Sequence, residues 1–287
     1  MRRSLALISA VSVIVFTQFA SAADLPRKAP AYTPPPAPVP LATWTGWYVG
    51  LNAGGHWSSN NDVDIVSTGT FNPVGFNPAI MNQAAQGATL NLPGNNNAGF
   101  IGGGQIGYNW QLTGWLLGIE ADFQGVSNNN NFDTVQTQVI ANNGFPIVTT
   151  VDGSRQIDWF GTVRGRLGWL ATPTLLLYGT GGLAYGHIKS NISITQTHEL
   201  SDTFGQTFVD NSKTRAGWTA GAGFEWMFFP RWSAKVEYLY YDLGDHTVTA
   251  PQLSAAFTNG FVRYGITPTI DASFKGNIVR AGVNYHF

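Results

Sequence analysis

The sequence predicts an all-β protein, an eight-stranded antiparallel transmembrane up-and-down β-barrel with four long extracellular loops and short periplasmic turns. Eight segments alternate apolar and polar residues with a period of two, as strands do when their two faces meet different surroundings. Nine of the ten tryptophans share the apolar parity of these segments, and that parity carries no charged residue. The connections alternate between tight turns and long stretches, which is typical of membrane barrels and not of soluble sandwiches.

The composition excludes several classes of protein. The 287 residues carry a net charge of −1, which gives no basic patch for nucleic acid, so no nucleic-acid partner is expected. The absence of cysteine excludes a disulfide framework, a thiolate metal site and a cysteine nucleophile. Charged residues make up only 11% of the chain and aromatic residues 13%, which argues against a disordered protein.

The first 43 residues are predicted to lie outside the barrel. Residues 1–22 form a signal peptide, in which two arginines precede a short apolar run and a small-x-small cleavage signature. The alternative, a membrane anchor, is disfavoured because polar residues interrupt the run. Residues 23–43 hold seven of the fifteen prolines and form a Pro-rich periplasmic leader, either a spacer or a weak envelope attachment. Residues 44–287 then form the outer-membrane β-barrel.

Four strands are predicted in the first half of the barrel, at about 46–58, 99–111, 115–126 and 155–170. Their outward residues are, in order, Trp47, Val49, Leu51, Ala53 and Trp57; Phe100, Ile106, Tyr108 and Trp110; Trp115, Leu117, Ile119, Ala121 and Phe123; and Ile157, Trp159, Val163, Leu167 and Trp169. Their inward residues are Asn52 and His56; Gln105, Asn109 and Gln111; Glu120, Asp122 and Gln124; and Asp158, Thr162, Arg164 and Arg166.

Four more strands follow, at about 175–187, 215–228 and 231–242 and at the end of the chain. Their outward residues are Leu175, Leu177, Leu183 and Tyr185; Trp218, Ala220, Ala222, Phe224 and Trp226; Trp232, Ala234, Val236, Tyr238 and Tyr240; and Val279, Ala281, Val283, Tyr285 and Phe287. Their inward residues are Tyr178, Thr180 and Ala184; Thr219 and Glu225; Ser233, Lys235 and Glu237; and Arg280, Asn284 and His286.

The connections between these strands are of two kinds. Tight turns are expected at 112–114, 172–174 and 229–230, and long loops at about 60–97, 127–154, 188–213 and 244–273. The long loops are rich in Asn, Gly, Ser and Thr, which predicts surface exposure and poor order. As an alternative for the first loop, the partly apolar stretch 80–92 forms an extra hairpin, which would raise the strand count to ten.

The outward aromatic residues fall at two heights along the strands. One belt, which we call the turn-side belt, flanks the tight turns or termini and consists of Trp47, Trp110, Trp115, Trp169, Trp226, Trp232 and Phe287. The other, which we call the loop-side belt, lies nearer the long loops and consists of Trp57, Phe100, Phe123, Trp159, Tyr185, Trp218 and Tyr240. Two such belts are typical of the two interfaces of a bilayer. The predicted girdle tryptophans are Trp47, Trp57, Trp110, Trp115, Trp159, Trp169, Trp218, Trp226 and Trp232.

The inward parity gathers a network of charges in the lumen. Its predicted members are Glu120, Asp122, Asp158, Arg164, Arg166, Glu225, Lys235, Glu237 and Arg280. An eight-stranded barrel has room only for its own side chains, and isolated buried ions are too unstable, so these charges must pair. The network is interpreted as a polar plug; a gated ion path or an acid/base site is the alternative.

The sequence offers no other chemistry. The triple glycine at 102–104 is not a phosphate loop, because no Lys-Ser/Thr pair and no helix follow it. The five histidines lack a metal-binding spacing, and no Ser-His-acid arrangement is evident. We therefore expect no catalytic residue, no bound metal, no cofactor and no enzyme activity.

The strand segments resemble those of the alphaproteobacterial small outer-membrane surface antigens, a porin-family group of eight-stranded barrels similar to the OmpA transmembrane domain and the opacity proteins. The matching segments are 44–55 (WTGWYVGLNAGG), 103–111, 118–124, 159–169, 178–186, 217–226 (GWTAGAGFEW), 235–244 and 281–287 (AGVNYHF). The resemblance implies a Gram-negative cell outer membrane, contact with its lipid, and insertion by the barrel-assembly machinery. Phe287, with Tyr285 before it, resembles the assembly signal which that machinery recognises.

Three functions are carried forward as hypotheses. The first is a structural outer-membrane protein with a plugged lumen, which supports envelope integrity, is exposed as a surface antigen, and has lipopolysaccharide or peptidoglycan as candidate partners. The second is a small-solute porin, which needs a wider lumen. The third is an adhesin or haem-binding surface that acts through its loops, on the phenylalanines Phe71, Phe76, Phe145, Phe204, Phe208, Phe257 and Phe261.

Overall fold

The computed structural model describes residues 43–287 except 61, 76, 93–97, 128–129, 132–133, 142–143, 199–202 and 257–261. The predicted signal peptide and all but the last residue of the predicted leader lie outside the described residues. The chain divides into two compact units, Met1–Val39 and Pro40–Phe287, and only the second is described below. No helix among the described residues is long and apolar enough to span a membrane.

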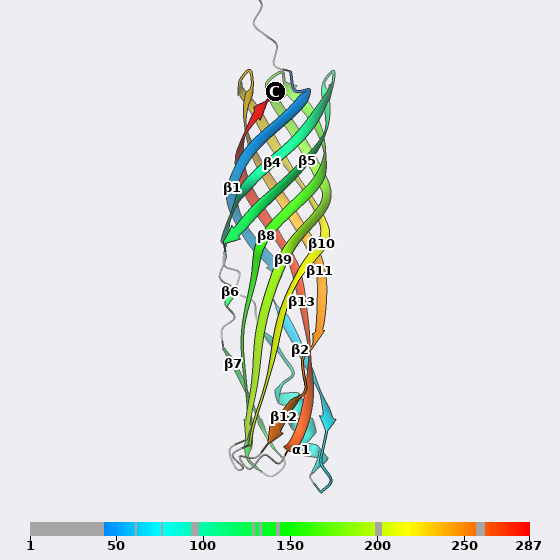
Figure 1. Cartoon of the computed structure of the whole chain (residues 1–287), viewed down its shortest axis with the longest axis vertical. Coiled ribbons are helices and arrows are strands. Elements are labelled where there is room, and N and C mark those ends of the chain that lie inside the picture. Colours follow the sequence, from blue (N-terminus) through cyan, green and yellow to red (C-terminus); the bar gives the residue numbers. More distant parts are fainter. Residues whose placement is uncertain are drawn as a thin grey trace, which may run out of the picture. The chain divides into compact units, whose positions relative to one another are not determined.

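Eight strands form a closed antiparallel ring (Figure 1). In ring order they are β1 (Gly46–Asn60), β4 (Gly99–Leu112), β5 (Trp115–Ser127), β8 (Pro146–Thr172), β9 (Leu175–His198), β10 (Thr203–Phe229), β11 (Trp232–Thr249) and β13 (Val262–His286). The last strand pairs with the first from Tyr48↔His286 to Asn60↔Lys275, and this pairing closes the ring. Each strand lies beside its neighbour in the chain order of the ring, which is the up-and-down arrangement that the alternation predicts.

The tight turns fall where the sequence places them. The pairing of β4 with β5 ends at Leu112↔Trp115, and the pairing of β10 with β11 ends at Phe229↔Trp232. Thr113 adopts a positive φ of 57°, the left-handed conformation that a two-residue hairpin requires. Gly114 follows it in the turn.

Long, poorly ordered loops were expected at the other end, and for most of the described residues this expectation is wrong. β8, β9 and β10 continue well beyond their predicted ends, with pairing that reaches Ile147↔His198 and Thr203↔His198. Further elements are β2 (Val63–Phe71), α1 (Pro78–Gly87), β3 (Leu90–Leu92), β6 (Asn130–Asn131), β7 (Val135–Ile140) and β12 (Leu253–Ala256). We call this part, which consists of the described residues within 62–98, 127–157, 188–215 and 243–273, the distal extension.

The first loop does not add a hairpin to the ring. β2 follows β1 along the same edge of β13, and the short β3 pairs with β2, both in the distal extension. Residues 80–87, which the alternative assigned to an extra hairpin, lie in α1. The helix starts at an Asn77 cap, whose side chain accepts a hydrogen bond from the Ala79 amide at 3.0 Å, and Pro78 occupies its first position.

The two faces of the barrel exchange polarity along single strands, as β9 shows. Near the tight turn, Leu177 and Leu183 face outward and are 43% and 50% exposed. Beyond residue 187 the outward residues are polar, and Ile192 and Ile194 are buried on the inner face. The pairing of β9 with β10 has no register shift in this region. The exchange of polar and apolar faces therefore comes from the order of residues along the strand. The inversion indicates lipid around the first part and water around the second.

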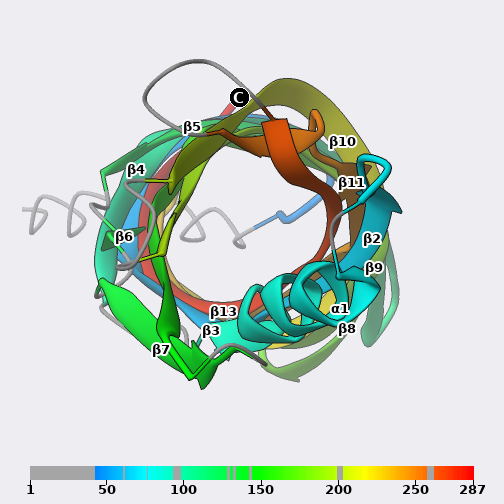
Figure 2. The ribbon, with the colours of Figure 1, turned by 90° about the horizontal axis from the view of Figure 1, so that it is seen from below.

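The distal extension therefore has an apolar core of its own. α1 packs against β2, β7, β8 and β13 at the loop end of the barrel (Figure 2). Its Ile80, Ala84 and Ala85 join a cluster of buried side chains from the surrounding strands, which includes Val63, Ile65, Leu92, Ile147, Val151, Ile192, Ile194, Val209, Leu253, Tyr264, Ile266 and Ile270. Gln196 satisfies the helix carbonyl of Ala84 with a hydrogen bond of 2.7 Å.

The placement of lipid and water along β11 can be tested with one substitution in each part. Val236 is 39% exposed on the outer face of the ring, and Thr249 is exposed on the outer face of the extension. Val236→Arg should reduce the free energy of unfolding by about 2–4 kcal/mol, because it places a cation in hydrocarbon. Urea titration of the refolded protein in lipid vesicles measures the change.

Thr249→Arg is the matched control, because it adds the same side chain to the same strand. Its expected effect is within about 0.5 kcal/mol, as for a water-exposed position. Equal effects of the two substitutions would show that the assignment of lipid and water along this strand is wrong.

Candidate functional site

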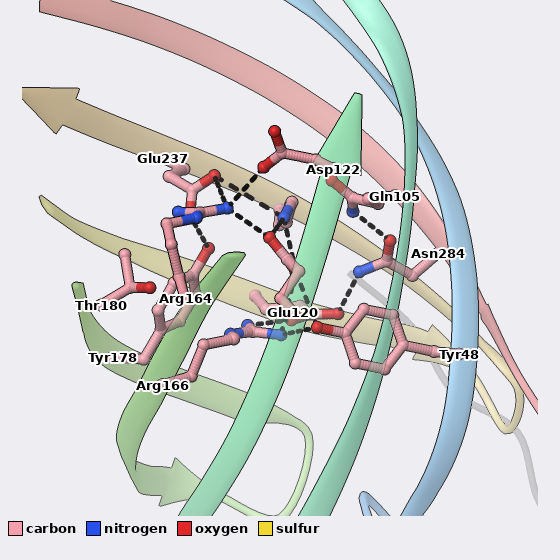
Figure 3. A network of polar contacts seen from close by, with 12 residues as sticks. Tyr48, Gln105, Glu120, Asp122, Arg164, Arg166, Tyr178, Thr180, Glu237 and Asn284 are labelled. Carbon is pink, nitrogen blue, oxygen red and sulfur yellow. Dashed lines mark hydrogen bonds and ion pairs between the residues drawn. The ribbon is translucent and has the colours of Figure 1, made fainter. Parts of the chain in front are cut away.

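Eight charged side chains meet inside the ring, and Figure 3 shows Glu120, Asp122, Arg164, Arg166 and Glu237 among them. They are Glu120 and Asp122 of β5, Arg164 and Arg166 of β8, Glu225 of β10, Lys235 and Glu237 of β11, and Arg280 of β13. In every ion pair between them, both side chains are fully shielded from solvent. Four carboxylates balance four cations, and we call this group the lumen network.

Arg164 connects three of the carboxylates. Its guanidinium lies 2.5 Å from Glu120 Oε1, 3.0 Å from Asp122 Oδ2 and 2.7 Å from Glu237 Oε2. Arg280 approaches from the opposite wall, 2.8 Å from Asp122 Oδ2 and 2.7 Å from Glu237 Oε1. Such shared, charge-assisted hydrogen bonds satisfy several oxygens at once, which is what burial of a charge requires.

Lys235 and Arg166 complete the network toward the tight turns. Lys235 Nζ donates to both oxygens of Glu120, at 2.9 and 3.0 Å. Arg166 lies 2.6 Å from Glu225 Oε2, and its guanidinium carbon lies 4.0 Å above the centre of the Tyr178 ring. Cations bind aromatic faces most strongly where water is excluded, as it is here.

Neutral polar side chains donate further hydrogen bonds to the carboxylate oxygens of the network. The Tyr48 hydroxyl donates to Glu120 Oε2 at 2.7 Å and accepts from Arg166 at 2.7 Å. Ser233 and Asn284 both donate to Glu225 Oε1, at 2.5 and 2.6 Å. The sequence analysis assigned no role to Tyr48, although its parity with Asn52 and His56 marks it as inward-facing.

Glycines in the wall make room for these side chains. A Cβ atom on Gly107 would overlap the Tyr48 hydroxyl, and one on Gly50 would overlap the Asn284 amide oxygen. Both positions therefore need the smallest residue because a network side chain fills the space beside them.

Asp158, the ninth predicted member, does not join the network, so this prediction is wrong. It lies instead 2.7 Å from Lys189 Nζ, in a pair whose side chains are 30% and 43% exposed. A β-bulge between Ile157 and Trp159 adds one residue and shifts the parity of the strand. The same shift turns Ile157 inward, against the apolar cluster around Phe160, although the sequence predicted it outward.

Apolar layers lie on both sides of the lumen network. On the turn side, Trp44 packs with Leu116, Leu176, Tyr178 and Met227. On the loop side, the layer consists of Ile101, Phe160, Ala184, Ile188, Leu239, Tyr241, Leu243, Phe274 and Ile278. A void of about 10 Å³, which is close to the smallest space that holds one water, lies in the loop-side layer.

Trp44 was the one tryptophan left without a role by the sequence. It is fully buried, and its indole nitrogen donates to the Pro173 carbonyl at 3.0 Å. Its ring meets that of His286 edge-on, with centroids 5.6 Å apart. Because Trp44 precedes the first strand, alternation gave no signal for its position; it covers the turn-side end of the lumen.

The predicted girdle tryptophans lie on the outer surface. Trp57 and Trp159 are partly exposed, and the other seven are 45–56% exposed. In the turn-side belt, the Trp47 ring contacts that of Tyr108, with centroids 5.3 Å apart. In the loop-side belt, the Trp218 ring contacts that of Tyr240, with centroids 5.4 Å apart.

The predicted assembly signal lies at the turn-side rim. Phe287 is 69% exposed, and its ring meets that of Tyr285 with centroids 5.3 Å apart. Its backbone amide donates to the Trp47 carbonyl at 3.0 Å. The part of the chain that the structure describes contains no group of three His, Asp or Glu residues placed to hold a metal ion.

The lumen network predicts a large difference between two acid-to-alanine substitutions. Glu120→Ala removes a buried partner from Lys235 and from three arginines, Arg164, Arg166 and Arg280. It should reduce the free energy of unfolding by about 3–5 kcal/mol. Asp158→Ala removes a partly exposed pair, and its effect should stay below about 1 kcal/mol. Urea titration in vesicles compares the two, and similar losses would contradict the network's stabilising role.

The chain is similar to known outer-membrane proteins. The family model of the outer membrane protein beta-barrel domain matches residues 19–287. The 31 kDa outer-membrane immunogenic protein of Brucella melitensis is 35% identical over 285 residues, which cover 98% of this chain and 99% of the relative. The 25 kDa outer-membrane immunogenic protein of Brucella abortus is 27% identical over 256 residues, which cover 86% and 90%.

Among solved structures, OprG of Pseudomonas aeruginosa matches 86% of this chain and 99% of its own, with 10% identity and a TM-score of 0.36. The family match and the Brucella relatives confirm the resemblance inferred from the strand segments. The chain belongs to the outer membrane protein beta-barrel domain family and is a protein of the Gram-negative outer membrane.

Proposed function

We propose that the protein is a structural outer-membrane barrel whose lumen is plugged, and which contributes to envelope integrity and carries a surface antigen. The observation that carries the proposal is the lumen network, in which each of the eight buried charges pairs with an opposite charge of the same network. Side chains of this kind hold the walls together from inside, as an apolar core does in a soluble protein.

The same network argues against a small-solute porin. A permeating ion would have to separate buried ion pairs and then pass two apolar layers. The loss of one partner from such a pair is strongly unfavourable. A ring of eight strands also leaves an interior that side chains fill.

The distal extension supports the antigen part of the proposal. Its outward faces are mostly polar, with a few exposed apolar side chains, and its elements are fixed by a core of their own, so it presents a folded surface. The Brucella relatives are named immunogenic outer-membrane proteins. We infer that the distal extension faces the outside of the cell and the tight turns face the periplasm.

Three candidate partners belong to this proposal: the barrel-assembly machinery, lipopolysaccharide and peptidoglycan. The exposed Phe287 at the end of β13 is available to the barrel-assembly machinery before the ring closes. Lipopolysaccharide is the candidate lipid around the loop-side belt, and peptidoglycan is the candidate on the periplasmic side.

The plugged lumen predicts that the protein does not conduct. In planar-bilayer recordings, the refolded protein should show no stable conductance of nanosiemens size, and vesicles that contain it should not swell in sugars. A refolded general porin in the same lipid is the positive control. Stable nanosiemens steps, or sugar-driven swelling, would replace this proposal with the porin.

A second function, adhesion through the distal extension, has one specific observation in its favour. Phe204 and Phe208 face outward on β10 and are 53% and 62% exposed, in a part of the barrel that meets water. Exposed aromatic residues of this kind often mark contact surfaces. Phe76, Phe257 and Phe261, from the same hypothesis, lie outside the described residues.

Adhesion predicts a loss of binding without a loss of folding. The double variant Phe204→Ser with Phe208→Ser should keep its heat-modifiable gel migration, yet bind host cells or haem more weakly than the unmodified protein. Ile140, which is exposed on β7, a strand that pairs with β8, provides a control in Ile140→Ser. Unchanged binding in the double variant would remove the adhesin hypothesis for this face.

A further inference from the structure

The sheet of the barrel is interrupted between β10 and β11. Their pairing stops at Trp218↔Asp242, although both strands continue into the distal extension. Beyond that point β10 pairs with β9, and β11 pairs with β13 as far as Thr249↔Thr269. We call the opening between residues 205–217 and 243–249 the β10–β11 gap.

Polar side chains occupy this gap. Asn211 Nδ2 lies 2.6 Å from His246 Nε2, and Arg215 contacts the other ring nitrogen of the same histidine. Lys213 lies between the two on β10. These four residues line a cavity of about 20 Å³ together with apolar residues that include Phe274. The cavity communicates with the outside, because Lys213 is exposed and Arg215 is only half-buried.

The two cations of the gap, Lys213 and Arg215, have no carboxylate partner among the described ion pairs. Arg164, Arg166, Lys189, Lys235, Lys275 and Arg280 each pair with an acid. Lys213 and Arg215 do not. The nearest acids along β11 are Asp242 and Asp245, which lie 3.6 and 3.4 Å from Lys275. Asp210 is exposed on the opposite face of β10.

A third cation lies behind the cavity. Arg155 of β8 pairs in register with Ser190 of β9, which in turn pairs with Asn211 of β10. Arg155 is only 7% exposed. Its guanidinium carbon lies 3.7 Å above the Phe274 ring, and its Nη1 has no hydrogen-bond partner. A buried cation without a counter-charge is unfavourable, so this row of the barrel favours an anion.

The position of the gap along the membrane normal indicates which kind of anion it binds. Trp218 belongs to the loop-side belt, and Arg215 and Lys213 follow three and five residues farther along β10. At about 3.3 Å per residue and a tilt of about 40°, they lie roughly 8 and 13 Å beyond the belt. The headgroup layer of a bilayer is about 5–8 Å thick on each side of the hydrocarbon. Arg215 therefore lies at the outer edge of the layer that holds lipid phosphates, and Lys213 lies about 5 Å farther out.

We propose that the β10–β11 gap binds a phosphate group through Lys213 and Arg215, with Arg155 as a buried counter-charge. A cavity of about 20 Å³ admits only a water-sized group, so the phosphate oxygens enter and the rest of the molecule stays outside. A lipid headgroup and free phosphate share this chemistry. The lateral opening beside the headgroup layer favours the lipid.

The test compares two substitutions at one height. The site variant is Lys213→Gln with Arg215→Gln. The control is Lys189→Gln, because Lys189 pairs in register with Ser212 but lies on the outer face, beside Asp158. Each protein, refolded in maltoside micelles, is titrated with inorganic phosphate by calorimetry. Its retention of phosphatidic acid and of diacylglycerol, which lacks the phosphate, is measured by native mass spectrometry.

We expect the unmodified protein to retain phosphatidic acid and not diacylglycerol, and the site variant to bind at least about tenfold more weakly. The control should be unchanged. Binding of phosphatidic acid alone identifies a lipid headgroup, and binding of inorganic phosphate identifies a solute. Lys213→Gln alone, at an exposed position, replaces the double variant if that variant does not show heat-modifiable migration.

Two results would overturn the proposal. The first is an equal loss of affinity in Lys189→Gln, which would show general charge attraction. The second is failure of the unmodified protein to distinguish phosphatidic acid from diacylglycerol together with failure to bind inorganic phosphate. Neither result bears on conductance, so the closed-barrel proposal is tested separately.

Discussion

The structure depends on one constraint, which is that every backbone polar group in hydrocarbon must be hydrogen-bonded within the protein. The pairing of β13 with β1 meets this constraint, because it leaves no open edge at the level of the aromatic belts. A ring of this size encloses a narrow space. Polar side chains that face into it have no water to solvate them, so they must satisfy one another. The lumen network follows from ring closure.

The constraint is relaxed where lipid gives way to water. In the distal extension β10 and β11 separate, and additional elements, α1 among them, supply contacts that the ring does not need. Ile192 and Ile194 of β9 turn inward to an apolar core, as in a soluble protein. One chain thus carries both kinds of barrel in series, with polar filling in lipid and apolar filling in water.

The ring and most of the lumen network could be predicted from the sequence, because both follow from a period of two. The tight turns and the eight paired charges depend only on local parity. The distal extension could not be predicted, since its strands carry Asn, Ser and Thr on the outer face, a composition that also suits irregular loops. Its apolar inner residues, such as Ile192 and Ile194, also alternate with polar ones, but the sequence does not show that α1 lies inside the barrel and packs against them.

One wrong prediction, at Asp158, and one omission, at Trp44, have local physical causes. The bulge before Trp159 inserts a residue without any mark in the sequence, and Asp158 leaves the lumen as a result. Trp44 precedes the first strand, so its burial depends on contacts with Pro173 and His286, which lie far along the chain. Parity predicts which face a side chain occupies within a strand, and it gives no information on residues outside strands or beside a register shift.

The continuity of β8, β9 and β10 has a mechanical consequence. β8 and β9 remain paired from Thr172↔Leu175 to Ile147↔His198, without a flexible linker between the ring and its far end. A pull on that end acts along the strands and at right angles to their hydrogen bonds, so it loads the whole ladder in shear and cannot open it one bond at a time. A body attached there would be held at a fixed height and would resist detachment by force.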